Sequence, residues 1–477
     1  MIHTNGEIII MKKQISLPIA LVLFAAIFAV MFTSLVFIKV EPHIPLLACL
    51  VLLSAVGAAF GASWKTLEKG MFNGIIAGLQ PIMILLTVGL VIASWMLSGT
   101  VPTLLFYGMD IIQPEWFAVS ALLITVIVSS FTGSSFTTVG TVGVALMGIG
   151  HVLGVNPALA AGAVVSGACF GDKMSPLSDS TNFAPGVVGV NMFEHIRHMM
   201  WTTVPAFILT AITFFVLGGK GTGAANFEEI QQIQSVLSNE FPIHAVTLIS
   251  PIVVLVLAFR KLPIIPILLA GVVVSIAVSF FLIPDLTVQK VMNVMQNGLQ
   301  TETGNGTVDS IVNKGGLLSM MWSISLVLIA LGLGGVIQAL GLFDLLFGAV
   351  KNTAQKAGKL IATTLASSVG INLLAGEMYL SILLPGQALK DAYVKSGVPL
   401  KNLSRTVEDG GTLVNPLVPW SVSGAFFAST LGVSVIDYIP YALFLWLSPM
   451  FTLLLAYTGW SIGQKKSQAD KDEHAAA

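Results

Sequence analysis

Residues 171–182 of the chain read GDKMSPLSDSTN. The three charged residues of this stretch, Asp172, Lys173 and Asp179, stand between two apolar segments. A charge at the centre of a bilayer costs about 2.5–3.5 kcal/mol, so we expect these side chains to face a bundle interior or a cavity rather than lipid. An exposed loop, with Asp179 capping the next helix, is the alternative interpretation.

The composition of the whole chain indicates that most of it lies in a lipid bilayer. Of its 477 residues, 55% are hydrophobic and 9% are charged, whereas soluble domains carry about 25% charged residues. Apolar segments recur between residues 15 and 460, and several are cut by Gly, Pro, Ser or Asp. This pattern predicts an all-α polytopic membrane protein with about 11–13 membrane segments, some of them broken or re-entrant. The net charge of −1 argues against a nucleic-acid partner.

Positive charge predicts the orientation of the chain in the membrane. A lysine pair at 12–13 precedes the first apolar segment, and another at 465–466 follows the last. Both termini are therefore predicted to be cytoplasmic, with a short N-terminal segment at 1–14 and a disordered tail at 461–477. A methionine directly before the first pair would also make a natural start, which leaves open whether residues 1–10 are native.

The two halves of the sequence resemble each other. SPL at 175–177 returns as NPL at 415–417, 240 positions later, and further matches occur in the same order. We therefore predict a first repeat at 15–218, an extracellular loop at 219–242 and a second repeat at 243–460. The lysine positions make the two repeats run in opposite directions across the membrane. Inverted repeats are typical of secondary transporters, whose site lies at the midplane between discontinuous helices.

Oxygen atoms are dense in the first stretch, and hard cations such as sodium prefer oxygen ligands. Pro176 has no N–H, so the carbonyl of Asp172 is expected to lose its helical partner. Lys173 is expected to neutralise the empty site or to compete for it as an ion-pair partner. The predicted ligands of sodium (or lithium) are Asp172, Ser175, Asp179 and Thr181.

The matching stretch of the second repeat has a similar shape but a different charge. Pro416 frees the carbonyl of Thr412, and an offset of 240 aligns Asp172 with Thr412. Asn415 supplies an amide here. Asp409, with its neighbour Glu408, is expected either to line the pathway or to lie at its mouth.

Further candidates interrupt other apolar segments. Glu377 is a lone carboxylate in an apolar sequence and therefore a candidate proton site. Thr132 and Ser134 lie in a break rich in Ser and Gly, where ion ligation and close helix packing explain the composition equally well. His195 and His198 could pair on a metal, but their charged neighbours favour a solvated cytoplasmic helix.

The stretch at 171–182 closely resembles the signature of NhaC-type sodium/proton antiporters, and EDGGTLVNPLVPW at 408–420 looks like that family's second block. The resemblance implies inverted repeats with broken helices. It also implies efflux of sodium or lithium in exchange for protons across a bacterial cytoplasmic (inner) membrane. The same family includes exchangers that couple sodium and protons to malate and lactate, and the motif does not separate these two activities.

Sodium/proton antiport by alternating access is the predicted function, with small inorganic cations and the bilayer as partners, a homodimer as one possible assembly, and no cofactor. Protons and sodium are expected to compete for Asp179 and Asp172, because a buried carboxylate is costly to keep charged without a counter-ion. Sodium-coupled organic-anion exchange is the alternative, and it needs a cation such as Lys173 or Arg405 facing the substrate. A passive channel does not require paired broken helices. An enzyme is not expected, since nucleotide-binding and hydrolase motifs are missing.

Overall fold

The computed structural model describes residues 3–4, 7–8, 15–218, 227–260, 262–351, 356–460 and 462. Within these ranges the secondary structure is helical apart from two short antiparallel strands, β1 (His3–Thr4) and β2 (Glu7–Ile8). Most of the predicted segments at 1–14 and 461–477 lies outside the described residues.

The helices of the first half are α1 (Leu17–Phe32), η1 (Thr33–Ile38), α2 (His43–Ala59), α3 (Trp64–Ala77), α4 (Leu79–Leu97), α5 (Thr100–Ile111), η2 (Pro114–Trp116), α6 (Phe117–Thr132), α7 (Ser135–Thr138), η3 (Val139–Gly143), α8 (Val144–Val152), α9 (Pro157–Met174), α10 (Asp179–Val188), α11 (Met192–Gly218) and α12 (Phe227–Glu240).

The helices of the second half are η4 (Ala245–Leu248), α13 (Ile249–Phe259), α14 (Ile264–Leu282), α15 (Val288–Asn297), α16 (Gly306–Val312), η5 (Leu318–Met320), α17 (Met321–Ala339), α18 (Leu342–Lys351), α19 (Ala357–Ala375), α20 (Met378–Lys395), α21 (Leu400–Gly411), η6 (Asn415–Leu417), α22 (Val422–Leu431), α23 (Val435–Tyr438), η7 (Ile439–Tyr441) and α24 (Leu443–Thr458).

Many of these helices can span a bilayer. Among the described residues, eight are long and apolar enough, and counting two strongly bent pairs as spans raises the number to ten. The bent pairs are Ile230–Glu240 with Ala245–Ala258 and Val422–Leu431 with Val435–Tyr441. Two shorter apolar helices, α2 and α24, add to this set. The predicted all-α membrane fold with broken helices is confirmed.

The helix breaks have local causes in the sequence. Helix α6 ends at Gly133, whose φ of 65° lies in the left-handed region that glycine adopts without strain. The Oγ of Ser134 then accepts a hydrogen bond from the backbone N–H of Thr137, at 3.1 Å, and starts α7. Helix α19 ends in the same way at Gly376 (φ 63°), and Glu377 caps α20.

Equivalent hydrogen bonds recur in the two halves at a spacing of 243 residues. The Ser129 hydroxyl donates to the carbonyl of Ala168 at 2.6 Å, and the Asn372 amide donates to that of Gly411 at 2.7 Å. The numbers differ by 372 − 129 = 243 and 411 − 168 = 243, as do those of Gly133 and Gly376. The predicted offset of 240 is therefore three residues short, because the Pro-Leu dipeptides matched by chance.

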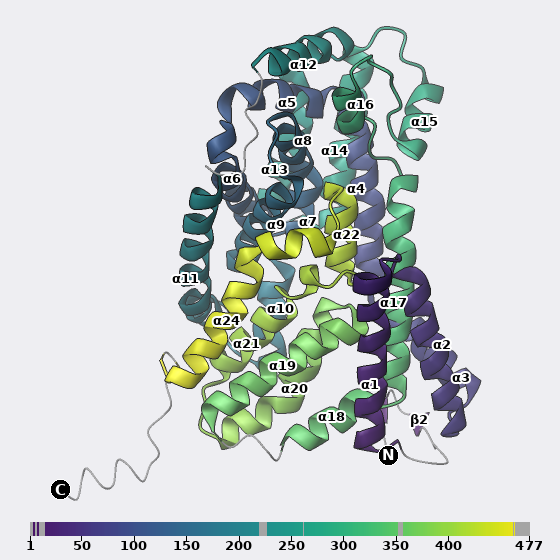
Figure 1. Cartoon of the computed structure of the whole chain (residues 1–477), viewed down its shortest axis with the longest axis vertical. Helices are drawn as coiled ribbons and strands as arrows, with labels where there is room; N and C mark the ends of the chain where they lie inside the picture. Colours follow the sequence, from purple (N-terminus) through teal and green to yellow (C-terminus); the bar gives the residue numbers. More distant parts are fainter. Residues whose placement is uncertain are drawn as a thin grey trace, which may run out of the picture.

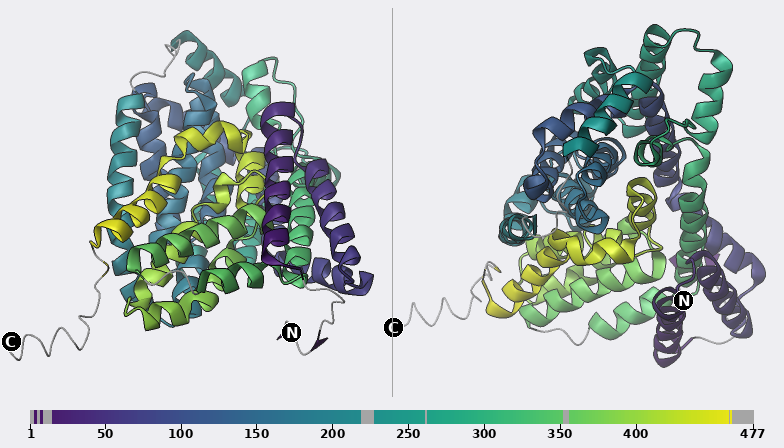
Figure 2. Two further views of the ribbon diagram at one scale, coloured as in Figure 1. Left: turned by 60° about the horizontal axis from the view of Figure 1, so that its bottom comes forward. Right: turned by 45° about the horizontal axis from the view of Figure 1, so that its top comes forward.

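Helices α1 and α24 bring the two ends of the described chain to the same side of the molecule (Figure 1). Figure 1 shows the start of α1 and the end of α24 toward the bottom of the molecule, and α12 at its top. Helices α2 and α3 pack along α17 at one side. Figure 2 shows the helices from α19 to α24, in green to yellow, lying against the blue helices of the first half. The contact between these two groups is where the helix breaks meet.

Candidate cation site

Four interrupted helices meet at one cavity. The interruptions separate α6 from α7, α9 from α10, α19 from α20 and α21 from α22, and residues of all four line a cavity of about 700 Å³. Backbone irregularity at membrane depth is tolerated where it lines such a cavity. The predicted site residues that line it are Thr132, Ser134, Asp172, Pro176, Asp179, Glu377, Thr412, Asn415 and Pro416.

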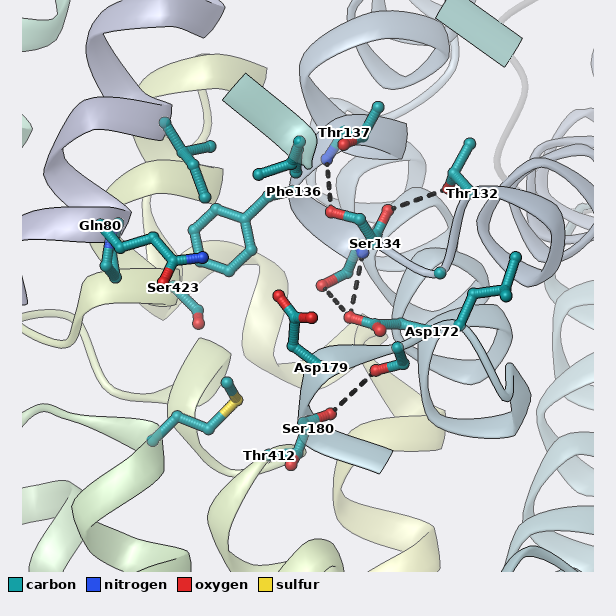
Figure 3. Close-up of a pocket in the computed structure, with 18 of the residues that line it drawn as sticks. Gln80, Thr132, Ser134, Phe136, Thr137, Asp172, Asp179, Ser180, Thr412 and Ser423 are labelled. Atoms are coloured by element: carbon teal, nitrogen blue, oxygen red, sulfur yellow. Dashed lines mark hydrogen bonds between the residues drawn. The ribbon is translucent and has the colours of Figure 1, made fainter. Parts of the chain in front are cut away.

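Asp172 links the α9–α10 break to the α6–α7 break. Its Oδ2 accepts hydrogen bonds from the backbone N–H of Ser135 at 3.0 Å and from the Ser135 hydroxyl at 2.7 Å. Ser135 opens α7, so the carboxylate at the end of α9 lies against the start of another helix (Figure 3). The partial positive charge of helix N–H groups stabilises a negative charge at this place.

Asp179 lies across the same cavity at the start of α10. The Ser178 hydroxyl caps this helix by accepting from the backbone N–H of Thr181, which leaves the Asp179 carboxylate free of capping. The side chain projects into the cavity near Asp172 (Figure 3). The two carboxylates therefore face one shared space, as the sequence predicts.

The other two predicted ligands lie behind the cavity wall. The Ser175 hydroxyl donates to the carbonyl of Ser130 at 2.7 Å, and the Thr181 hydroxyl donates to that of Lys173 at 3.0 Å. Neither residue lines the cavity. The carbonyl of Asp172 is not free either, because the backbone N–H of Ser175 donates to it at 3.0 Å in a tightened last turn.

Lys173 and Asp409 form a fully buried ion pair away from the cavity. The Asp409 carboxylate also accepts from the hydroxyls of Ser448 at 2.7 Å, Thr452 at 2.5 Å and Thr202 at 3.2 Å. Buried charges persist in proteins when they are paired and hydrogen-bonded in this way. Lys173 therefore does not neutralise the first stretch, and Asp409 does not line the cavity, because the two residues neutralise each other.

Glu377 and Asn415 line the cavity from the second half. Oε2 of Glu377 accepts from the backbone N–H of Leu380 at 2.6 Å. The Asn415 amide donates to Oδ1 of Asn372 at 2.9 Å, and its oxygen accepts from the backbone N–H of Ser423 at 3.0 Å. Glu377 thus brings a carboxylate to the cavity, whereas Asn415 is held as a structural link.

The sequence did not predict three of the observed arrangements. Ser135 binds Asp172, and only its place beside Ser134 signalled it. Glu408 is fully buried and accepts from the Ser180 hydroxyl at 3.1 Å and the Thr412 hydroxyl at 3.0 Å. His195 and His198 are buried rather than solvated, and they hydrogen-bond to Ser404 and Asn402.

A multi-span helical bundle whose interrupted helices enclose a carboxylate-lined cavity has the architecture of an ion-coupled membrane transporter. Residues 167–460 match the Na+/H+ antiporter family, and the chain belongs to this family. It is 55% identical over 461 residues to the Na(+)/H(+) antiporter NhaC of Alkalihalophilus pseudofirmus, covering 97% of this chain and 100% of that protein.

Two proteins of Bacillus subtilis are also similar to the chain. Its Na(+)/H(+) antiporter NhaC is 45% identical over 447 residues, covering 94% of this chain and 99% of that protein. Its malate-2H(+)/Na(+)-lactate antiporter is 33% identical over 471 residues, covering 97% of this chain and 99% of that protein. The resemblance of the 171–182 stretch to NhaC-type antiporters is thereby confirmed.

Proposed function

We propose that the protein exchanges sodium, or lithium, for protons across the bacterial cytoplasmic membrane. The observation that carries this proposal is the pair of carboxylates, Asp172 and Asp179, facing one cavity among four interrupted helices. Carboxylate oxygens suit a hard cation. The similarity to two proteins named as sodium/proton antiporters supports the same conclusion.

Competition between ions for the two carboxylates accounts for the exchange. When sodium leaves the cavity, the two negative charges that line it are left without a counter-ion, and protonation removes that cost. When sodium enters, it favours the ionised carboxylates and the protons leave. A site that alternately faces the two sides of the membrane then carries sodium one way and protons the other.

Alternating access follows from the two halves if they are inverted copies. We assign them to residues 15–218 and 243–460, with the connection at 219–242 outside the cell and both termini in the cytoplasm. Equivalent hydrogen bonds at a spacing of 243 residues support two copies of one unit. Two copies that run in opposite directions can exchange conformations and so expose the cavity to either side.

Organic-anion exchange of the malate/lactate type is the weaker candidate. It needs a cation or an uncapped helix N-terminus facing the substrate carboxylate. The helices that start at the cavity, α7, α10, α20 and α22, are already capped by Ser134, Ser178, Glu377 and Ser421. Neither Lys173 nor Arg405, the two cations considered for this role, is among the residues that line the cavity, and Lys173 is paired with Asp409. The relative with that named activity is also less similar, at 33% identity.

Transport by the purified full-length chain in liposomes tests the proposal. Sodium, lithium, potassium, malate and lactate gradients are imposed in turn, and internal pH is followed with a trapped dye. We expect sodium and lithium gradients to move protons, and potassium, malate and lactate gradients to leave the pH unchanged. Proton movement that requires malate or lactate would overturn sodium/proton exchange in favour of the organic-anion alternative.

A further inference from the structure

Glu408 lies one layer behind the cavity. Its side chain on α21 is fully buried and does not line the cavity, whereas the two residues that donate to it, Ser180 and Thr412, both do. Both hydroxyls bond to the same carboxylate oxygen, Oε1, at 3.1 and 3.0 Å. We propose that Glu408 is a proton-binding site separate from the cation site, loaded through these hydroxyls. This inference rests on the proposed sodium/proton exchange.

A chain of hydroxyls connects the two sites. The Ser180 hydroxyl lies 3.2 Å from that of Ser178, as Figure 3 shows for Ser180, and Ser178 lines the same cavity as Asp172. The order Ser178, Ser180, Glu408 thus joins the cavity to a carboxylate of the second half. Each hydroxyl can accept one proton and release another, so the hydroxyls can carry a proton from the cavity to Glu408 without any heavy atom moving.

Sodium cannot use this route. A sodium ion keeps several oxygen ligands around it, so its passage would require the buried side chains between the cavity and Glu408 to separate. A proton needs only continuous hydrogen bonds. The route through the hydroxyls of Ser180 and Thr412 therefore admits protons and excludes sodium. This selection does not depend on the affinity of Glu408 for either ion.

The surroundings of Glu408 favour a proton as its ligand. Charged or titratable groups on the helices around Glu408 include Asp172 and Lys173 of α9, Asp179 of α10, His195 and His198 of α11, Glu377, Tyr379 and Tyr393 of α20, and Arg405 and Asp409 of α21 itself. The cation Lys173 is bound to Asp409. Oε2 of Glu408 has no hydrogen-bond partner among the residues described. A buried carboxylate so placed is costly when charged, and a proton removes that cost.

Two transport assays on the full-length chain separate the proton site from the cation site. The first measures proton movement driven by a sodium gradient, and the second measures counterflow of labelled sodium against unlabelled sodium at constant pH. For Glu408→Gln we expect proton movement to fall about tenfold or more while sodium counterflow stays within about twofold of wild type. Asp172→Asn, in the cation site, should lose both.

A second variant tests the hydroxyl route without touching the carboxylate. Ser180→Ala with Thr412→Val removes both donors, and we expect slower proton movement driven by a sodium gradient. Glu302→Gln, at an exposed carboxylate, is the matched control and should behave as wild type in both assays. Elution of each variant at the wild-type volume in gel filtration establishes that it has folded.

Several outcomes would overturn the proposal. Wild-type proton movement in Glu408→Gln would show that the carboxylate carries no transported proton. Loss of sodium counterflow in the same variant would place Glu408 within the cation site itself. A full proton rate in the double hydroxyl variant would exclude the route through Ser180 and Thr412. Failure of wild-type protein to move protons in response to sodium is a different result, which overturns the proposed function and with it this inference.

Discussion

The α9–α10 break of the first half and the α21–α22 break of the second half share a backbone geometry but differ in charge. We call them the first break and the second break. At the spacing of 243 residues, Asp172 corresponds to Asn415. Asp172 accepts two hydrogen bonds from Ser135 and lines the cavity. Asn415 donates to Asn372 and Gly376 and accepts from Ser423, so its amide is fully used. The same backbone position can therefore carry a candidate ion ligand, Asp172, in one copy and a structural hydrogen-bonding residue, Asn415, in the other.

At the preceding break of each half, α6–α7 and α19–α20, the charge difference is reversed. Ser134 and Glu377 are also 243 residues apart, and each caps the helix that follows it. Here the second copy has the carboxylate and the first has a neutral hydroxyl. The cavity thus receives two carboxylates from the α9–α10 break and one from the α19–α20 break. Because the backbone is symmetric but the charge is not, we expect the cavity to hold one cation site rather than two.

The largest expected effect separates the roles of Asp172 and Asn415. Asp172→Asn keeps a hydrogen-bond acceptor for Ser135, so the protein should fold while sodium-driven proton movement falls by about two orders of magnitude. Asn415→Ala should act mainly on stability, because it leaves buried groups unpaired at about 1–3 kcal/mol each. Transport in liposomes and thermal unfolding of the purified variants measure the two effects.

The opposite result would contradict the assignment of the ion site to the first break. If Asp172→Asn unfolds the protein and Asn415→Ala folds normally but cannot transport, then the ion site lies in the second break. Asp179→Asn provides a control within the first break. It faces the same cavity as Asp172, so it should also lose transport without losing stability.

The buried ion pair gives the next largest effect, on stability. Lys173→Met leaves the charge of Asp409 buried without its partner, which costs about 3–5 kcal/mol. The double variant Lys173→Met/Asp409→Asn removes both charges and should recover most of the lost thermal stability. A double variant no more stable than the single one would mean that Lys173 stabilises the fold through something other than Asp409.

A smaller effect concerns the pH dependence of sodium binding. If one proton competes with sodium at the first break, the apparent sodium affinity should weaken by about tenfold per pH unit in the acidic range. Glu377→Gln in the α19–α20 break should leave that slope unchanged, since glutamine can still accept from the backbone N–H of Leu380. Initial rates at a series of sodium concentrations and pH values measure the slope. A flat affinity in wild type, with transport still coupled, would exclude competition between protons and sodium at the first break.

The sequence located residues whose position follows from their own chemistry. It did not reveal contacts that depend on how the helices pack. Asp172 and Asp179 could be located because charge, proline and hydroxyls in an apolar chain cannot face lipid. The choice between Glu408 and Asp409 could not be made, because adjacent residues point about 100° apart around a helix and packing decides its rotation. Lys173 could not be paired with Asp409 for the same reason, since the pair spans 236 positions.

The smallest effect compares the two glycines that end α6 and α19. Alanine at a left-handed position costs about 1–2 kcal/mol whatever its surroundings, so Gly133→Ala and Gly376→Ala should both lower the unfolding temperature. Their surroundings differ, however. A Cβ at Gly133 would lie 2.7 Å from the backbone of Leu177 in the first break, whereas one at Gly376 would lie no closer than 3.1 Å to its nearest neighbour, the carbonyl of Trp420.

The decrease in unfolding temperature should therefore be larger for Gly133→Ala, and its transport rate should also fall because Leu177 lines the cavity. Gly376→Ala should lose stability but keep most of its transport. Gly370→Ala is the matched control within α19, since a Cβ there meets open space in an ordinary helical conformation, and helix propensity predicts an equal or higher unfolding temperature. An equal loss of transport in both cap variants would mean that the α19–α20 break is as tightly coupled to the cation site as the first break. The division of roles between the two copies would then fail.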